Sequence, residues 1–380
     1  MTGKNVFNTK NKKMKKLLSV ILVSAVLAGC SPKAPLSIDG KGFRHQKLSE
    51  LPDSLIKSRT FVEFDSTDPE FMFNSAEDVK IKNGLIYVKY RYNRNSKVLV
   101  FDMGGMPAFK VDRKGEGPEE YTQVSAFDID GKGRIHIIDG RTDELLVYGP
   151  GGGFIKRTKL PFEADDVKCL SEGGYLFALC TWNTRQCSGN KAAVTDSLLN
   201  VKASYLKYDQ YHDDRAIVAS NGFTQAGGGI TAFNEHISNT VRMFDDTGRL
   251  VDSCSYDFGP YNVPDEDKKD VENNIYGNTS YRCLSGPGTV GKRFAFGSIY
   301  DGKRGFSFIA DRDTGTIYTD QGAAEACLLS MITGGTAGGA VLSCLTPGMP
   351  GLDKVKNIPE DVLTHLENEN FVLCITELKG

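Results

Sequence analysis

The sequence has little tryptophan, no hydrophobic run of membrane-spanning length and no excess of positive charge. It holds one Trp in 380 residues, and its apolar run at residues 17–27 has 11 residues, whereas a spanning helix needs about 20. The formal net charge is −2, but the first 29 residues carry six Lys and no acid, which leaves 40 basic against 48 acidic residues, or −8. A mildly acidic chain of this kind argues against nucleic acid as the main partner.

The N-terminus has the features of a secretory signal that ends in a lipidation site. Lys residues surround Met14, the apolar run follows, and the small residues Ala28 and Gly29 precede Cys30. This order resembles a bacterial lipobox, which predicts removal of residues 1–29 and a lipid on Cys30, with Met14 as an alternative start. An ordinary signal peptide before an incidental Cys is the alternative. Several acyl chains anchor a protein stably, so residues 30–57 are expected to tether it to a membrane that it does not cross.

A short hairpin pattern recurs along the rest of the chain. Its core reads apolar–x–apolar–aromatic–Asp and is followed by a Gly turn and a second strand; we place it at residues 98–102, 145–149, 205–209, 241–245 and 306–311. Asp and Gly suit the turn because Asp bonds its own backbone and Gly allows positive φ. Further strand pairs with Gly turns lie between these hairpins, most clearly at residues 79–88 and 128–139.

Four antiparallel strands that repeat every 40–60 residues or so are typical of β-propeller blades. Residues 58–380 therefore predict an all-β fold, a six-bladed β-propeller of four-stranded antiparallel blades. The chain ends fit closure of a ring. Residues 359–369 begin with Pro and acids and predict a helix, and the strand expected at 371–376 is predicted to share a blade with the first strand, residues 60–64.

The combination resembles the six-bladed β-propeller lipoproteins of Bacteroides and relatives, a group related to NHL-repeat and TolB-like propellers. The similarity covers nearly the whole mature chain, and it depends on Cys30, the hairpin at 101–105 that runs into residues 115–121, the segments 238–241 and 257–259 with Pro264, and the terminal strand 370–379. Phe371 stands where the family usually has Pro. The resemblance implies the fold and a cell-envelope location, with most members lacking an assigned activity. No acidic run follows Cys30, which favours the periplasmic side of the outer membrane.

The segment from Gly115 to Tyr121 is the most specific motif. Gly115 and Gly117 do not form a phosphate loop, because no Gly-Lys-Ser/Thr follows and Pro118 lacks the N–H that such a loop would need. We interpret it as a structural loop in which Pro118 opens a short turn and Glu119 and Glu120 sit at its positive end. A contact with a ligand through Gly115, Gly117, Pro118, Glu119 and Tyr121 is the alternative, since loops often carry function.

Cysteine and histidine give no metal or cofactor pattern. The five His (His45, His136, His212, His236 and His365) lack metal-ligand spacing, and no Cys-x-x-Cys occurs. Cys180 and Cys187 flank Trp182 and are candidates for a disulfide, which an envelope compartment permits. Free, buried thiols are the equal or better interpretation for the Cys residues in apolar or small-residue surroundings, namely Cys169, Cys254, Cys327, Cys344 and Cys374.

Two classes of function remain. The first is a non-catalytic binding or scaffold module, a monomer that presents loops of a rigid ring to a protein or glycan partner. The second is a metal-dependent hydrolase similar to lactonase-type propellers, for which Asp128, Asp139, Asp165 and Asp166 are candidate ligands. Fold alone implies no chemistry, so binding is favoured. Three or more acids and Asn facing one axial pocket would favour the enzyme.

Overall fold

The computed structural model describes residues 36–37 and 52–380, apart from 74–75, 94, 215–221, 236, 304, 320–331, 336–337, 350–351 and 353–357. The chain divides into residues 1–35 and residues 36–380, and the account below concerns the second unit. The signal segment, Cys30 and Cys327 lie outside the described residues. None of the helices in the described part of the chain is long and apolar enough to cross a bilayer.

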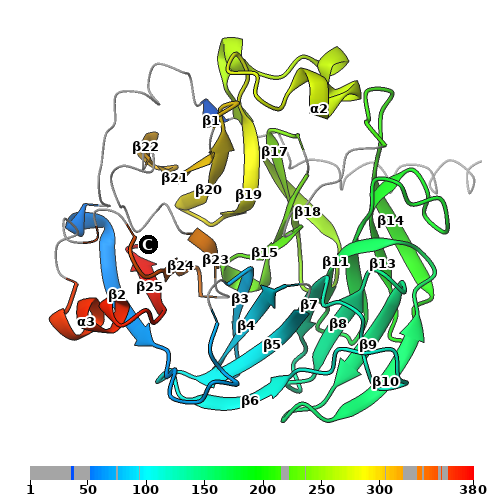
Figure 1. The fold of residues 1–380 in the computed structure, drawn as a ribbon. Helices are drawn as coiled ribbons and strands as arrows, with labels where there is room; N and C mark the ends of the chain where they lie inside the picture. The colour runs from blue at the N-terminus through cyan, green and yellow to red at the C-terminus, as the bar shows by residue number, and fades with distance from the viewer. Residues whose placement is uncertain are drawn as a thin grey trace, which may run out of the picture. The chain divides into compact units, whose positions relative to one another are not determined.

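Six four-stranded antiparallel sheets surround a common centre, which confirms the predicted six-bladed propeller (Figure 1). The first five blades use strands in chain order, and β3, β7, β11, β15, β19 and β23 lie nearest the centre. The first blade is β3 (Asp78–Lys82), β4 (Leu85–Tyr92), β5 (Asn95–Asp102) and β6 (Pro107–Val111). The second is β7 (Ala126–Ile129), β8 (Ile135–Asp139), β9 (Glu144–Tyr148) and β10 (Phe154–Lys159), and the third is β11 (Ala164–Cys169), β12 (Tyr175–Leu179), β13 (Asn190–Thr195) and β14 (Val201–Lys207).

The other three blades complete the ring. The fourth is β15 (Phe223–Gln225), β16 (Thr231–Asn234), β17 (Thr240–Phe244) and β18 (Leu250–Asp257), with β1 (Leu36–Ser37) added in parallel to β18. The fifth is β19 (Cys283–Val290), β20 (Phe294–Tyr300), β21 (Gly305–Asp311) and β22 (Thr316–Thr319). The sixth is β23 (Ile332–Gly335), β24 (Val341–Leu345), β25 (Val372–Leu378) and β2 (Ile56–Glu63).

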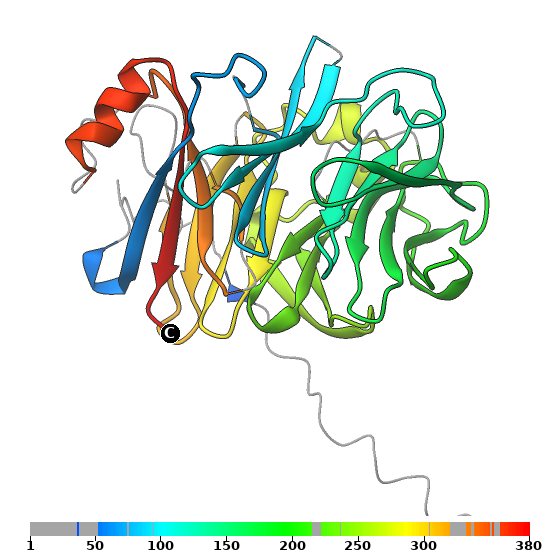
Figure 2. The ribbon, with the colours of Figure 1, turned by 90° about the horizontal axis from the view of Figure 1, so that it is seen from below.

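Short helices occur only in the connections of the described chain. The 3₁₀ turns are η1 (Asp53–Leu55), η2 (Gly227–Gly229), η3 (Gly259–Tyr261) and η4 (Asp265–Lys269), and the α-helices are α2 (Val271–Asn274) and α3 (Glu360–Glu367). In the second view the blade strands run between two faces of the ring, with α3 at one face and the C-terminus at the other (Figure 2).

The predicted turn chemistry sets the hairpins. The carboxylate Oδ1 of Asp102 accepts hydrogen bonds from the backbone N–H groups of Gly104 and Met106, at 2.8 and 3.0 Å. Gly105 needs its glycine, because φ is +85° and a Cβ there would lie 1.9 Å from the carbonyl oxygen of Glu63. Asp245 makes the same pair of backbone bonds after β17.

The third predicted hairpin is wrong. Residues 205–209 end the outermost strand β14, whereas the matching strand of that blade is β13. Asp196 after β13 makes the turn bonds, to the N–H groups of Leu198 and Asn200. Thr195 stands where the other units have an aromatic residue or Ala, so the pattern missed the strand and selected Tyr208 and Asp209 instead.

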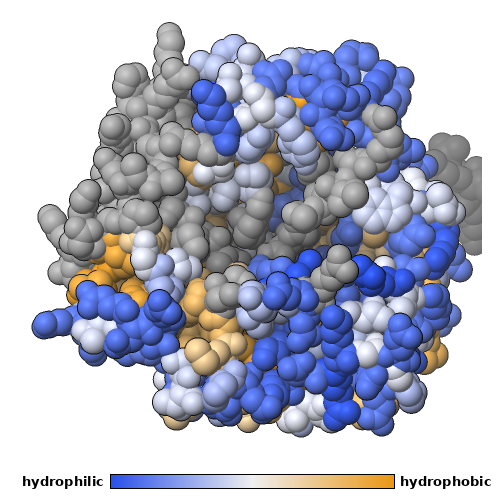
Figure 3. Space-filling view, in the orientation of Figure 1, coloured by the Kyte–Doolittle hydropathy of each residue, from blue (hydrophilic) through white to orange (hydrophobic). Residues whose placement is uncertain are grey.

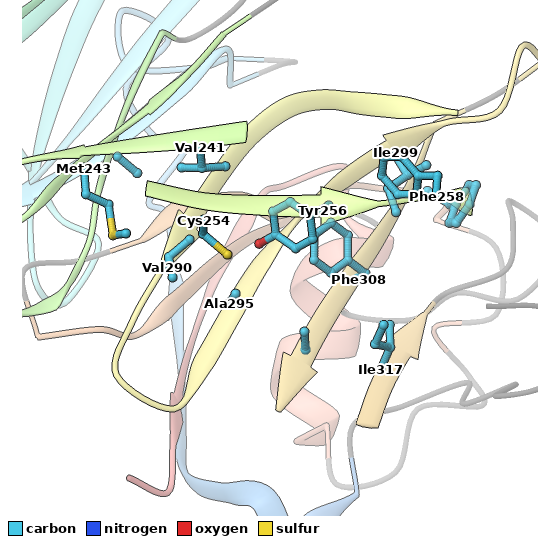
Figure 4. Close-up of a cluster of buried hydrophobic side chains, with 13 residues drawn as sticks. Val241, Met243, Cys254, Tyr256, Phe258, Val290, Ala295, Ile299, Phe308 and Ile317 are labelled. Carbon is cyan, nitrogen blue, oxygen red and sulfur yellow. The ribbon is translucent and has the colours of Figure 1, made fainter. Parts of the chain in front are cut away.

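A hydrophobic cluster fills each of the six interfaces between successive blades. Between the fourth and fifth blades, Val241, Cys254 and Tyr256 face Val290 and Phe308 (Figure 4). The rings of Tyr256 and Phe308 meet edge to face with centroids 5.4 Å apart. Each fully buried side chain of this kind contributes about 1.5–3 kcal/mol, so a blade that cannot bury both faces alone gains its stability from its neighbours.

The two ends of the chain close the ring as predicted. β2 and β25 pair in antiparallel fashion, with Phe61 opposite Cys374. α3 lies within the predicted helix 359–369 and buries Val362 and Leu366 against the outer side of the sixth blade, in one cluster with Val372.

Candidate functional site

A pocket of about 320 Å³ lies between the third and fourth blades and is the candidate site. We call it the interblade pocket. Its walls come from β11 to β14, β16 and β17, and from the segment that contains η4 and α2. The residues that line it are Asp165, Ala178, Leu179, Thr181, Lys191, Lys207, Tyr208, Asp209, Tyr211, His212, Asp213, Gly222, Phe233, Asn234, Glu235, Ile237, Ser238, Arg242, Lys268 and Val271.

A buried ion-pair group holds one wall of this pocket. Glu235 is 8% exposed, and its carboxylate pairs with the ammonium of Lys191 and with the guanidinium of Arg242, whose Nε lies 2.7 Å from Oε1. Lys191 belongs to the third blade, whereas Glu235 and Arg242 belong to the fourth. A buried carboxylate needs such partners. The group therefore fixes the two blades to each other and carries two positive charges for one negative charge.

Aromatic rings form a second part of the lining, next to Lys191 of this group. The rings of Tyr208 and His212 stack with centroids 3.7 Å apart and planes 22° from parallel, and the Lys191 ammonium lies 5.2 Å from the centroid of Tyr208. Burial, and then the nearby Asp165, raises the pKa of the Tyr208 phenol, so the hydroxyl stays protonated. Burial also raises the pKa of Asp165, an effect that the hydrogen bond from the Cys180 thiol at 3.2 Å opposes.

Charged residues also alternate with apolar ones along the innermost strands. Lys80 lies 3.1 Å from Asp78 on β3, and Lys168 on β11 lies 3.1 Å from Asp128 on β7. We call these residues, together with Asp166, the inner-strand charge network. The backbone N–H of Cys169 donates to Asp128 at 2.8 Å and that of Phe223 donates to Asp166 at 2.8 Å. These bonds join the second blade to the third and the third to the fourth.

The pKa values of two acids of this network are shifted in opposite directions. Burial would raise the pKa of Asp128, but Lys168 and Lys80 outweigh it and hold that pKa below its ordinary value. At Asp166 burial dominates over Lys80, and with the repulsion of Asp78 it raises the pKa to about 6. Burial would lower the pKa of Lys80, but Asp78, Asp166 and Asp128 outweigh it and raise that pKa. Lys80 is thus charged at neutral pH.

The loop of residues 115–121 is bound to the first two blades through its own hydrogen bonds. Tyr121 is fully buried, and its hydroxyl donates to the carbonyl oxygens of Ser96 and Val111, at 2.9 and 3.0 Å. The Gly117 N–H donates to the carboxylate of Glu120 at 2.8 Å. A Cβ on Gly115 would lie 1.8 Å from that same carboxylate, so the motif's glycine makes room for this acid.

The second blade holds the loop from its other side. The Tyr148 hydroxyl donates to the carbonyl oxygen of Glu119 at 2.9 Å, and Arg157 donates to that of Gly117 at 3.0 Å. Pro118 and Glu119 are exposed. None of the predicted loop residues lines the interblade pocket, and contact of this loop with a ligand stays a prediction.

The cysteine prediction needs a correction. Cys180 and Cys187 are both free thiols in the structure, so the suggested disulfide is not formed. Cys180 is buried and donates to Asp165, while Cys187 lies within a separate turn and packs against the cluster between the second and third blades. The prediction relied on the closeness of Cys180 and Cys187 in the sequence, on either side of Trp182. In the structure their side chains have different partners. The other predicted free thiols within the described residues, Cys169, Cys254, Cys344 and Cys374, are free as well.

The four acids proposed for a metal do not converge. Asp139 is fully buried and accepts hydrogen bonds from Thr122, whereas Asp165 faces the interblade pocket and Asp128 and Asp166 belong to the inner-strand charge network. Within the described residues no group of three or more His, Cys, Asp or Glu side chains is placed to hold a metal ion.

Of the residues that line the pocket, Asp165 was proposed as a ligand from the sequence, but the pocket itself was not predicted. Lys191, Glu235 and Arg242 have no shared motif, and they meet only because the third and fourth blades are neighbours. The inner-strand charge network left a weak signal in the sequence, because Asp78-Val79-Lys80 and Asp166-Val167-Lys168 are the same pattern in the first strand of two blades.

On the face seen in Figure 3 the described surface is mainly hydrophilic, with apolar residues gathered beside the sixth blade.

Comparison with known proteins gives a family and a fold. The family described as "Domain of unknown function (DUF4934)" matches residues 41–335. A protein of Bacteroides fragilis that is described as exported is 19% identical with a TM-score of 0.68, over 87% of this chain and 97% of its own. A DUF4221 family member of Bacteroides vulgatus is 10% identical (TM-score 0.48; 86% and 98%), and virginiamycin B lyase of Staphylococcus aureus is 8% identical (TM-score 0.41; 84% and 99%). No curated protein matches the chain.

Proposed function

We propose that this chain, which belongs to the DUF4934 family, is an envelope lipoprotein whose propeller binds its partner without catalysing a reaction. The proposed anchor is a lipid on Cys30, and the proposed site is the interblade pocket. The partner is a protein or a glycan, and the protein itself acts as a monomer. The proposed location is the periplasmic side of the outer membrane.

The observation that carries this proposal is the interblade pocket with its fixed polar wall. Ligand pockets usually combine an apolar surface with a few well-placed polar groups and have volumes of roughly 300–1,000 Å³. The interblade pocket meets the condition on volume, and Phe233 and Ile237 give it apolar surface beside the Glu235 group, while polar residues form most of its lining. Polar groups that are already fixed cost little entropy when a ligand binds, and Glu235 is held by two cations from two blades.

The acids of the described residues favour binding over metal-dependent hydrolysis. A catalytic metal site needs several ligands on one ion with an open position. Asp128 and Asp166 instead accept backbone N–H groups from the strand of the next blade, and Asp139 accepts the backbone N–H of Thr122. Support for the envelope location comes from the Lys-rich and apolar order before Cys30, and the Bacteroides fragilis protein with the same fold is described as exported.

Fractionation and co-purification test the anchor and the binding role together. The tagged full chain and a Cys30→Ala variant are expressed in the native envelope, extracted in mild detergent and analysed by mass spectrometry for protein and attached glycan. We expect the wild-type chain in the outer-membrane fraction with a stoichiometric partner, and the variant outside the membrane fraction. A wild-type chain that fractionates without the membrane would overturn the lipoprotein proposal.

A metal titration separates binding from the enzyme alternative. A ligand present at 100 times its Kd stabilises the folded state by about 2.7 kcal/mol, so a calcium-binding propeller would melt at a clearly higher temperature in calcium than in EDTA. We expect the two melting curves to coincide. A large calcium-dependent rise in Tm, together with turnover of a lactone, would refute the non-catalytic proposal.

A further inference from the structure

We infer that the interblade pocket binds the end of a neutral saccharide chain, one or two sugar rings long. This inference rests on the proposed binding function and names its ligand class. It comes from three properties of the lining, which are its charge balance, its fixed hydrogen-bonding groups and its aromatic wall.

The lining carries equal numbers of opposite charges. Four acids and four bases line the pocket: Asp165, Asp209, Asp213, Glu235, Lys191, Lys207, Arg242 and Lys268. A ligand with a net charge would leave groups of the same sign facing it at a cost. A neutral ligand that both donates and accepts hydrogen bonds uses both sets. Hydroxyl groups do this, because each has one donor and two acceptor sites.

The polar groups are already held in place. Arg242 donates from its Nε to Glu235, and one-third of its side chain is exposed. A guanidinium has five N–H donors, so its other nitrogen atoms have further N–H groups to donate. Asp209 is fixed by the Tyr211 N–H at 2.8 Å. A sugar presents several hydroxyls at fixed angles, and a rigid set of donors and acceptors reads such a pattern without an ordering cost.

The aromatic wall suits the C–H face of a sugar ring. Tyr208 and His212 are stacked, and Tyr211 follows in the same segment. Sugar rings carry an apolar C–H face beside their hydroxyls, and a flat aromatic surface packs against such a face while leaving polar edges to the charged wall. The volume of about 320 Å³ is at the lower end of ligand pockets, which limits the ligand to a chain end.

The test is calorimetric titration of the mature protein with defined probes. The neutral probes are N-acetylglucosamine, galactose, mannose and their β-linked disaccharides, and the charged probes are glucuronate and glutamate. We expect at least one neutral sugar to bind and glutamate not to bind. The proposal is overturned if no neutral sugar binds, or if only the charged probes do.

Two variants locate the binding. His212→Ala removes one ring of the stack, and Asp209→Asn keeps the turn acceptor for the Tyr211 N–H but removes a charge from the balanced lining. Each is expected to weaken sugar binding about tenfold or more. The controls are Tyr92→Ala, an exposed tyrosine on β4, and Glu116→Gln, an exposed acid of the loop, and both are expected to bind as wild type. Unchanged affinity in both pocket variants would refute the location.

The outcomes distinguish this inference from the proposed function. A protein partner that co-purifies with the wild type while no sugar binds would leave the binding role standing and remove the saccharide. Sugar binding followed by release of hydrolysed product would keep the ligand class and remove the non-catalytic role.

Discussion

The raised pKa of Asp166 predicts an unusual dependence of stability on pH. Its carboxyl group is 3% exposed and has a pKa of about 6 in the folded state, against an ordinary value of 3.8. The folded state therefore binds this proton more readily than the unfolded state does between roughly pH 4 and pH 6. The stability that this group contributes is complete below that window and is lost as the pH rises through it. At about 1.36 kcal/mol for each pKa unit, the loss at neutral pH is on the order of 3 kcal/mol.

The Asp166→Asn variant removes the titration and keeps an acceptor for one of the two backbone N–H groups, those of Val167 and Phe223, that donate to this side chain. Equilibrium unfolding in guanidinium chloride, followed by far-ultraviolet circular dichroism from pH 4 to pH 7.5 at constant salt, gives the free energy of unfolding of both proteins. We expect the free energy of unfolding of the variant, relative to that of wild type, to rise by about 3 kcal/mol as the pH goes from 4 to 7. Because burial lowers the pKa of His136, that residue has the opposite pH dependence in both proteins, and the difference removes it.

The matched comparison is Asp128→Asn in the same network. The pKa of Asp128 is lowered, so its stabilisation is present above about pH 4 and lost below. Loss of its charge leaves the Lys168 ammonium unpaired, which costs about 3–5 kcal/mol at neutral pH. A difference between Asp166→Asn and wild type that stays flat from pH 4 to pH 7, or that falls, would refute the reasoning about Asp166.

Three further predictions follow from the fold. Tyr121→Phe should lower the free energy of unfolding by about 1–3 kcal/mol, since the carbonyl groups of Ser96 and Val111 lose their donor; chemical denaturation measures it, and an unchanged midpoint would contradict the hydrogen-bonding role. Without reductant, native protein should react with a maleimide at half-buried Cys187 and not at buried Cys180, and both thiols should react after unfolding. If mass spectrometry finds neither Cys labelled and a protein mass lower by two hydrogen atoms, the disulfide between them is formed after all. A chain that begins at residue 64 lacks β2 and should aggregate through the uncovered β25 edge, whereas one that begins at residue 52 should remain monomeric by gel filtration; equal behaviour would contradict ring closure by β2.

The sequence was sufficient for the fold because turn chemistry is local. Asp102 with Gly105, and Asp245 with Gly248, specify a hairpin within a few residues, and the alternation of apolar residues identifies the strands beside them. The prediction failed at the third blade, where Thr195 stands in place of the aromatic residue, so the strand lacked the residue by which the pattern was recognised. Local patterns thus specify most units of a repeat and fail where one unit diverges.

The interblade pocket could not be predicted because its residues are joined only by the packing of blades. Lys191 and Glu235 are 44 residues apart in the chain, and each belongs to a strand or loop with an ordinary charged residue. The buried pairing of Lys168 with Asp128 has the same cause. The packing of neighbouring blades brings separate polar residues together into a site. A single sequence does not show which residues of one blade face which residues of the next.

The pairing of β2 with β25 also sets the order of events when the chain folds. Phe61 and Cys374 are 374 − 61 = 313 residues apart, and closing a loop of that length costs on the order of 4 kcal/mol more than closing a hairpin, by the 3/2 RT ln n relation. The first five blades must therefore bring the two ends close before this pair forms. Because a nascent chain emerges from its N-terminus, β2 stays unpaired until β25 has been made. Lys57, Arg59 and Glu63 place charges along this strand, and such charges protect a waiting edge from pairing with another molecule.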